Sequence, residues 1–319
     1  MKVAITGGAG RIGALVLDAL GGKHEMSVLD ARMPDETPDG VEYHEVDILE
    51  MHGLQEALSS ADAVVHLAAI PWDLPDDAPL VGRVNVLGTL HVLEAAARAG
   101  VRKVVLASSI CAVGPMFRVN PWLPDCFPVD EDHPTTPENT YGISKLVNEL
   151  QGRMYHSRHG MDVICFRIAP VWFDQMNPFT TWSVAGVYQP EINKDSIWAY
   201  VGAEDVAQAI GLALRDGCDG YRIYNVGAGD ACADVDSLEL IQTHYPDVPV
   251  VRLAEFADAP RRPVWSIDRI TAQLGYRPTK TWREYAALLP EPVVEAARTG
   301  SSADLREVIY GTRGERPMG

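Results

Sequence analysis

A tyrosine and a lysine lie four residues apart, Tyr141 and Lys145, in the stretch ENTYGISKLVNEL at residues 138–150. Residues four apart on a helix share one face, so this pattern predicts a phenol beside an ammonium group. An adjacent positive charge favours the phenolate and lowers the pKa of a tyrosine, which is otherwise a poor base at neutral pH. Such a pair could remove a proton from a substrate hydroxyl. The alternative is a surface pair at a helix start, and other motifs must decide between the two.

A glycine-rich segment, TGGAGRIG at residues 6–13, stands between an apolar run and a helical pattern. Its glycines Gly7, Gly10 and Gly13 have the spacing GxxGxxG. Glycine permits a tight turn and a close approach to a pyrophosphate, and the start of the following helix offers free N–H groups. Between a strand and a helix, the motif predicts a dinucleotide-binding turn, with Arg11 and Ile12 among its cofactor contacts.

Asp30 ends the second predicted strand, at the position where a ribose-binding acid is expected, about 20 residues after the glycine turn. Its carboxylate can accept hydrogen bonds from both ribose hydroxyls and would repel a 2′-phosphate. This favours NAD over NADP. Arg11 and Arg32 lie nearby, and an arginine could instead accommodate that phosphate.

The elements that must position these residues alternate between strands and helices. Expected strands cover residues 3–6, 26–30, 41–46, 63–67, 104–107 and 163–168, with helical patterns after residue 10, over 84–99 and after Tyr141. This alternation predicts an α/β fold, a Rossmann-like doubly wound parallel sheet, with a smaller C-terminal substrate-binding region. We expect a dinucleotide-binding domain over residues 1–168 and a mixed substrate region over 169–319, from which a helix at 204–214 and a strand at 223–226 return to complete the core. Residues 174–196 read as a loop-rich insert, and the residues from about Gly300 as a polar tail.

Composition excludes several classes of function. The 319 residues are 47 % hydrophobic and carry a net charge of −17, so a nucleic-acid partner is not expected. The five cysteines are scattered without a CxxC motif, which predicts neither a disulfide framework nor a zinc site. His156 and His159 lack a third ligand, so no metal is expected. No apolar run is long enough to span a membrane, and the chain enters a strand at once, so we expect a cytoplasmic protein with no membrane partner.

With these motifs in place, the chain resembles the extended short-chain dehydrogenase/reductases, in the NAD-dependent epimerase/dehydratase family. Beyond the glycine turn, Asp30 and YGISK, the resemblance rests on VDI at 46–48, HLAA at 66–69, NVLGTLHVLEAA at 85–96 and ASS at 107–109. It implies that Ser109, Tyr141 and Lys145 form the catalytic set, and that Lys145 also holds the nicotinamide ribose. It further implies cofactor contacts from Asp47, Ile48, Leu67, Ala68, Ala69 and Asn85, together with Tyr141 and Lys145.

The resemblance also implies a homodimer and a sugar-type small-molecule substrate, but it leaves the reaction open. Ile110 and Cys111 replace the acidic pair of the dehydratases, and the insert after Trp172 is short for a nucleotide clasp. Arg261 and Arg262 could still contact a phosphate, and a long segment between Ser109 and Tyr141 could roof a smaller substrate. We therefore expect an NAD-dependent dehydrogenase acting on a sugar, uronic acid or related polyol. The alternatives are a UDP-sugar 4-epimerase and a cofactor-sensing binding protein without catalysis, and the intact Ser109, Tyr141 and Lys145 argue against the last.

Overall fold

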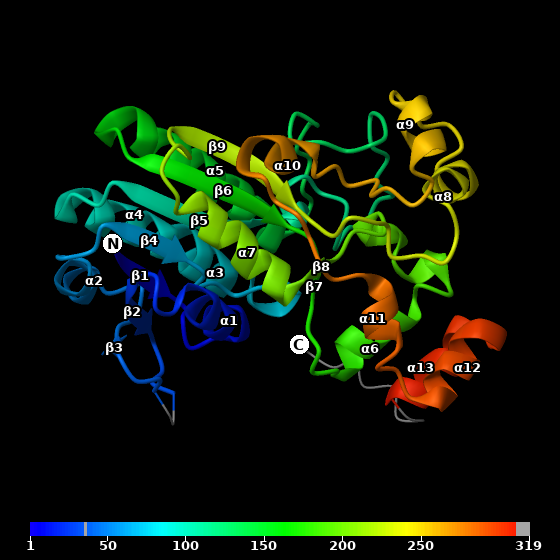
Figure 1. Cartoon of the computed structure of the whole chain (residues 1–319), viewed down its shortest axis with the longest axis horizontal. Helices are drawn as coiled ribbons and strands as arrows, with labels where there is room; N and C mark the ends of the chain where they lie inside the picture. The colour runs from blue at the N-terminus through cyan, green and yellow to red at the C-terminus, as the bar shows by residue number, and fades with distance from the viewer. Residues whose placement is uncertain (35–36, 311–319) are drawn as a thin grey trace.

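A seven-stranded parallel sheet forms the centre of the molecule (Figure 1), as a computed structural model of residues 1–34 and 37–310 shows. Its strand order is β3-β2-β1-β4-β5-β6-β9. The bounds are β1 (Lys2–Thr6), β2 (Glu25–Asp30), β3 (Val41–Glu45), β4 (Ala63–His66), β5 (Lys103–Ser109), β6 (Asp162–Ile168) and β9 (Tyr221–Val226). The predicted doubly wound sheet is confirmed. The strand order reverses between β1 and β4, and such sheets bind ligands at the carboxyl ends of the strands beside that reversal.

Alternating strand residues build a separate core on each face of the sheet. Val3 and Ile5 of β1 join the core covered by α1 (Arg11–Leu20) and α7 (Ala203–Ala213), whereas Ala4 joins the opposite core. That second core is covered by α2 (Met51–Ala57), α4 (Gly88–Ala99) and α5 (Thr140–His159). Because both faces are buried, the strands read as continuous apolar runs.

The helix that carries Tyr141 and Lys145 has clear start and stop signals. The Asn139 side chain accepts a hydrogen bond from the Gly142 N–H at 2.7 Å and caps the first turn of α5. Gly160 ends the helix in the left-handed conformation, at φ 69°. The 20-residue helix packs against β5 and β6, so its first turn lies at the carboxyl ends of these strands.

The helix expected over 84–99 is longer and less regular than its pattern suggested. The chain runs through the 3₁₀ turn η1 (Pro75–Asp77), α3 (Ala78–Val81), the π-helical η2 (Gly82–Leu87) and then α4. Asn85 lies within the π-helical turn and is fully buried. Such wide turns frequently occur at functional sites.

Most of the remaining elements gather beyond the carboxyl ends of the sheet strands, whereas α10 (Asp268–Leu274) packs beside β9 (Figure 1). The others comprise the 3₁₀ turns η3 (Ile110–Ala112), η4 (Pro190–Ile192) and η5 (Lys194–Ser196), the strand pair β7 (Val171–Trp172) and β8 (Val201–Gly202), and the helices α6 (Pro178–Ala185), α8 (Ser237–His244), α9 (Leu253–Asp258), α11 (Trp282–Ala286), α12 (Glu291–Thr299) and α13 (Ser302–Tyr310). No helix in the described ranges is both long and apolar enough to span a membrane.

Two expectations for the C-terminal region of the chain were wrong. The insert over 174–196 contains a helix, α6, which Asn177 caps by accepting from the Thr180 N–H at 2.9 Å. Part of the expected polar tail is helix α13, because Ser301 donates to the Asp304 carboxylate at 2.7 Å and Leu305 is fully buried. Residues 311–319 of that expected tail lie outside the described residues.

Candidate active site

The glycine turn follows β1 and faces the loop after β4. Gly7 has φ +71°, and a Cβ there would lie 2.6 Å from the Ala68 nitrogen. A Cβ on Gly13 would lie 2.5 Å from the backbone of Gly8. Both positions therefore exclude a side chain, and the backbone of Ala68 can approach the glycine turn closely.

The start of α1 is suited to an anion. Gly10 precedes the helix, no side chain caps it, and its first turn contains no acidic residue. The first N–H groups of a helix have no intrahelical partner and carry a partial positive charge. Arg11, Ile12 and Gly13 supply these groups, and they fit the pyrophosphate of a dinucleotide.

Asp30 lies directly beside this turn. Its carboxylate accepts hydrogen bonds from the Ala9 N–H at 3.1 Å and from the Arg32 N–H at 3.2 Å. Arg11 extends elsewhere: its guanidinium stacks 3.7 Å over the Phe173 ring and donates to the Gln175 carbonyl at 3.4 Å. The acid, and not the Arg11 guanidinium, therefore adjoins the backbone of the turn.

The residues after β3 differ in their exposure. Asp47 is exposed, and its carboxylate accepts from the Leu49 N–H at 2.9 Å. Ile48 is buried and packs against Gly88, where a Cβ would lie 2.4 Å from its Cδ1. The side chain of Ile48 is thus directed into the core, and only its backbone remains for the expected cofactor contact.

The loop after β4 is held by Asn85. The Leu67 N–H donates to the Thr6 carbonyl at 3.0 Å, and Ala68 contacts Gly7, which brings residues 67–69 beside the glycine turn. The Asn85 side chain accepts from the Ile70 N–H at 2.8 Å and donates to the Ile70 carbonyl at 3.0 Å. It also donates to the Ser144 hydroxyl at 3.1 Å. Its polar atoms are occupied by protein partners, so Asn85 positions this loop against α5.

A buried histidine supports the same region. The Thr89 hydroxyl donates to the Asn85 carbonyl at 2.6 Å, so it accepts from His66 Nε2–H at 2.9 Å. His66 Nδ1 must then accept from the Thr6 hydroxyl at 2.6 Å. Burial lowers the pKa of His66 to about 3, and the neutral imidazole is structural.

Ser109, Tyr141 and Lys145 meet at the carboxyl end of β5. Ser109 is the last residue of that strand, and Tyr141 and Lys145 occupy successive turns of α5. Lys145 Nζ donates to the Ala107 carbonyl at 2.8 Å and lies 5.6 Å from the centroid of the Tyr141 ring. All three side chains are buried, and the structure brings together the three residues that the sequence predicts as catalytic.

The expected lowering of the Tyr141 pKa depends on the positive nicotinamide ring of bound NAD as well as on Lys145, and in the protein alone the pKa is raised. Burial raises the pKa of Tyr141, the neighbouring Cys111 thiol acts in the same direction, and a hydrogen bond to Ser109 opposes them. Burial also lowers the pKa of Lys145 to about 8. Removing the phenol from water is therefore the largest effect on the pKa of Tyr141, and it outweighs the hydrogen bond to Ser109.

Sequence reasoning missed three residues around this set. The Tyr141 N–H donates to the Asp73 carboxylate at 3.3 Å, and Glu149 and Arg167 form a buried ion pair at 2.9 Å. The signal for the pair was available, since Arg167 is a charge within the buried strand DVICFRI. Asp73 had no comparable signal because it lies in an irregular loop.

Arg261 and Arg262 are engaged by carboxylates. Arg261 pairs with Asp234 and Asp236, and Arg262 pairs with Glu255 and Asp268. The earlier suggestion of a phosphate contact therefore has no support from these two guanidinium groups.

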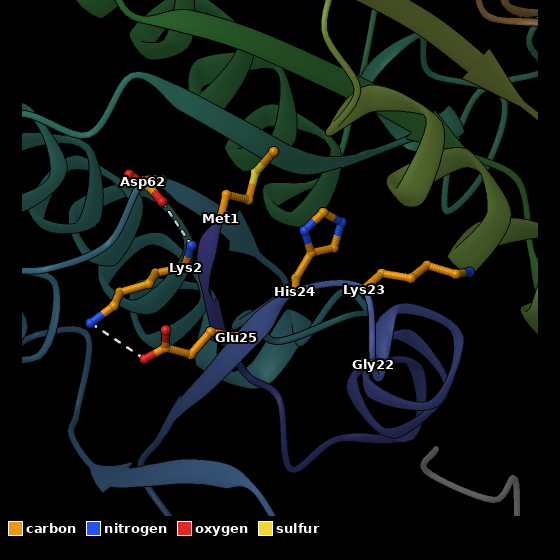
Figure 2. Close-up of a pocket in the computed structure, with 7 residues that line it drawn as sticks. All are labelled: Met1, Lys2, Gly22, Lys23, His24, Glu25 and Asp62. Carbon is orange, nitrogen blue, oxygen red and sulfur yellow. Dashed lines mark hydrogen bonds and ion pairs between the residues drawn. The ribbon is translucent and has the colours of Figure 1, made fainter.

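An open hollow at the amino ends of the sheet strands contains none of the candidate site residues. Figure 2 shows it at the amino ends of β1 and β2, where Lys2 pairs with Glu25 at 3.3 Å and the Lys2 N–H donates to Asp62 at 2.8 Å. Ligands of parallel α/β sheets bind at the carboxyl ends of the strands, so the candidate site is at the opposite end of the strands from this hollow.

Residues 3–227 match the family model of the NAD dependent epimerase/dehydratase family. The chain belongs to this family. Two curated relatives come from Haloferax volcanii: an L-arabinose 1-dehydrogenase (NAD(P)(+)), 33 % identical over 173 residues, and an NAD-dependent glucose-6-phosphate dehydrogenase, 35 % identical over 178 residues. Each match covers 52 % of this chain, and the matches span 66 % and 67 % of the two relatives. A solved structure, the Thermus thermophilus UDP-glucose 4-epimerase in complex with NAD, is 26 % identical with a TM-score of 0.65, over 94 % of this chain and 100 % of that one. The relatives of this family member thus include both sugar dehydrogenases and epimerases.

Proposed function

We propose that this protein is an NAD-dependent oxidoreductase that acts at a carbinol carbon of a sugar or related polyol. The observation that carries the proposal is the buried cluster of Ser109, Tyr141 and Lys145 beside a glycine turn whose helix start is uncapped. Family membership and the sugar dehydrogenases among the relatives support it.

NAD fits the residues present, and when bound it supplies the hydride acceptor. Gly7, Gly10 and the first turn of α1 would hold its pyrophosphate, and Asp30 its adenosine ribose. Asp47 and the backbone of residues 67–69 would line the rest of its path. The Asp30 carboxylate beside the turn supports NAD as the preferred form, because it would repel a 2′-phosphate.

The remaining chemistry belongs to side chains of this chain. The Ser109 hydroxyl would hydrogen-bond the reacting oxygen and hold it near the phenol of Tyr141. Tyr141 would take the hydroxyl proton as general base. Because burial raises the pKa of Tyr141, this step depends on positive charge arriving beside it, and Lys145 is the protein group one turn away.

A UDP-sugar 4-epimerase is the second candidate, and its support is the similarity to the Thermus enzyme. We rank it second because Arg261 and Arg262 are both paired with carboxylates and are not poised for a diphosphate. A dehydrogenase accumulates NADH, whereas an epimerase returns the hydride and regenerates NAD.

The decisive experiment follows NADH absorbance with purified protein, NAD and a panel of free sugars, uronic acids, sugar phosphates and UDP-sugars. A steady rise with a free sugar is expected. A changed UDP-sugar without net NADH would replace the proposal with epimerisation. A complete absence of both products would remove the enzymatic assignment.

We further propose a homodimer, a cytoplasmic location and a substrate side formed mainly by residues 169–319. Ile143, Leu150 and Met154 lie on one face of α5 and are exposed, with Leu87 of η2 exposed as well. A second copy would cover this apolar stripe. All five cysteines are free thiols, which supports a reducing compartment.

A further inference from the structure

Asp73 places a carboxylate at the junction of two parts of the site. It belongs to the loop that continues from residues 67–69, and it accepts a hydrogen bond from the backbone N–H of Tyr141 at 3.3 Å. Burial raises the pKa of the Cys111 thiol to about 12, and the nearby charge of Asp73 acts in the same direction. The carboxylate therefore stands between the expected cofactor loop and the first turn of the catalytic helix.

The contact with the helix start uses only part of the Asp73 carboxylate. Asn139 accepts from the Gly142 N–H at 2.7 Å, and Asp73 accepts from the separate N–H of Tyr141. Asp73 is partly exposed, and only one of its carboxylate oxygens accepts a hydrogen bond from the residues that the structure describes. A carboxylate with two oxygens has about four acceptor positions, so Asp73 retains capacity for donors from a ligand.

Several cations on the substrate side are engaged by carboxylates of the protein. Five basic residues beyond the carboxyl ends of the strands are each paired with carboxylates: Arg118, Arg261, Arg262, Lys280 and Arg283. Lys145 donates to the Ala107 carbonyl. The whole chain carries a net charge of −17. Asp73 has no ion-pair partner among the residues that the structure describes, so a carboxylate or phosphate on the substrate would meet its charge directly. Like charges brought together favour a competing neutral ligand.

We propose that Asp73 accepts hydrogen bonds from substrate hydroxyls near the reacting carbon and restricts the site to uncharged polyhydroxy substrates such as neutral aldoses. Uronic acids, sugar phosphates and UDP-sugars are excluded. This inference rests on the proposed oxidoreductase function and narrows its substrate class. Sugar hydroxyls are donors, and hydrogen bonds to an ionised acceptor are stronger than neutral ones.

The test compares wild type with Asp73→Asn, using kcat/KM for neutral aldoses, uronic acids and glucose 6-phosphate. The asparagine keeps an oxygen for the Tyr141 N–H and removes only the charge. Asp76→Asn is the matched control, since Asp76 is an exposed acid in the same segment. Wild type should favour a neutral aldose by at least tenfold, and Asp73→Asn should lower kcat/KM for it by about 10–100-fold, mainly through KM. The loss of kcat/KM for anionic sugars should be smaller, so the preference for the neutral aldose over anionic sugars should shrink in Asp73→Asn. Asp76→Asn should match wild type.

An equal loss on neutral and anionic sugars would reduce Asp73 to a structural role and overturn the inference. A wild-type preference for an anionic sugar would also overturn it. Calorimetry of sugar binding to NADH-loaded protein tests the role of Asp73 independently of whether the protein is a dehydrogenase. Neutral-sugar binding that weakens in Asp73→Asn without any turnover would retain the Asp73 assignment and remove the dehydrogenase. Binding of a UDP-sugar alone, or of no sugar, would overturn the Asp73 assignment.

Discussion

Glu149 of α5 and Arg167 of β6 form a two-point ion pair inside the molecule. Arg167 Nε lies 2.9 Å from Oε1 and Nη2 lies 2.9 Å from Oε2, with only 4 % and 3 % of the Arg167 and Glu149 side chains exposed. The Ser108 hydroxyl donates to Glu149 Oε1 at 2.6 Å. Ser108 precedes Ser109, and Glu149 follows Tyr141 by two turns on the same helix. The pair therefore ties the helix of the predicted base to the strand of the predicted serine.

Replacing Glu149 with Gln should destabilise the protein by about 3 kcal/mol or more, because the Arg167 charge would remain buried without its counter-ion. Urea unfolding measures the change in free energy. Glu56→Gln is the control, since Glu56 is exposed in α2 and should change stability by less than about 1 kcal/mol. Similar values for both variants would contradict a structural role for the buried pair.

Tyr141→Phe should lower kcat by about 10²–10⁴-fold, because it removes the hydroxyl that is expected to take the proton. NAD affinity should stay close to wild type, since the ring still fills the same space. Steady-state rates and fluorescence titration with NADH give the two readouts. Wild-type turnover in this variant would remove Tyr141 from the mechanism.

Asp30→Ala should weaken NAD by about 10–100-fold and NADP by less, because the expected ribose acceptor is lost while the repulsion of a 2′-phosphate disappears. Dissociation constants for both cofactors test this change. Asp18→Ala, on the exposed face of α1, should leave both constants unchanged. An unaltered NAD/NADP ratio in Asp30→Ala would place the ribose elsewhere.

The pKa of Lys145 gives a stability prediction with a definite sign. Its pKa falls from 10.5 to about 8 on burial, so between these pH values the unfolded chain binds a proton that the folded protein does not. The free energy of unfolding should therefore rise from pH 8 to 10, by on the order of 2 kcal/mol. Lys145→Met should lack this part of the rise when the two proteins are compared by urea unfolding across the range. Parallel pH curves would show that Lys145 is not shifted.

Leu150→Glu should convert the proposed dimer to a monomer, because it places a charge in the exposed apolar stripe of α5. Light scattering at micromolar concentration measures the mass. Leu253→Glu, at an exposed leucine of α9, should leave the mass of the dimer unchanged. A monomeric wild type would refute the dimer itself.

Regular elements were predictable wherever one local signal dominated. The apolar runs that became β1, β4 and β6 are buried on both faces, and the glycine turn has steric reasons for its glycines at Gly7 and Gly13. The meeting of Ser109 with Tyr141 and Lys145 came only through family resemblance, since the two segments are joined by a long irregular loop. Periodicity carries no information about such a juxtaposition.

Elements near the substrate side were harder to predict for physical reasons. Helix α6 has the sequence PFTTWSVA, whose aromatic and β-branched residues have low helix propensity, and packing against α11, α12 and α13 stabilises it. For α13 a usable signal existed: Ser301 and Asp304 form a capping pattern before the apolar Leu305. Asp73 and the paired arginines depend on tertiary contacts that no local pattern specifies.

The hydrogen bonds through His66 have one direction. Thr6 donates to the imidazole, the imidazole donates to Thr89, and Thr89 donates to the carbonyl of Asn85. Each proton in this chain of hydrogen bonds has an acceptor, and burial lowers the pKa of His66 to about 3, so a second proton on the imidazole is strongly disfavoured at neutral pH. The line of hydrogen bonds therefore does not carry protons readily, although it lies beside the expected cofactor loop. The proton that Tyr141 is proposed to take therefore needs a route that does not pass through His66.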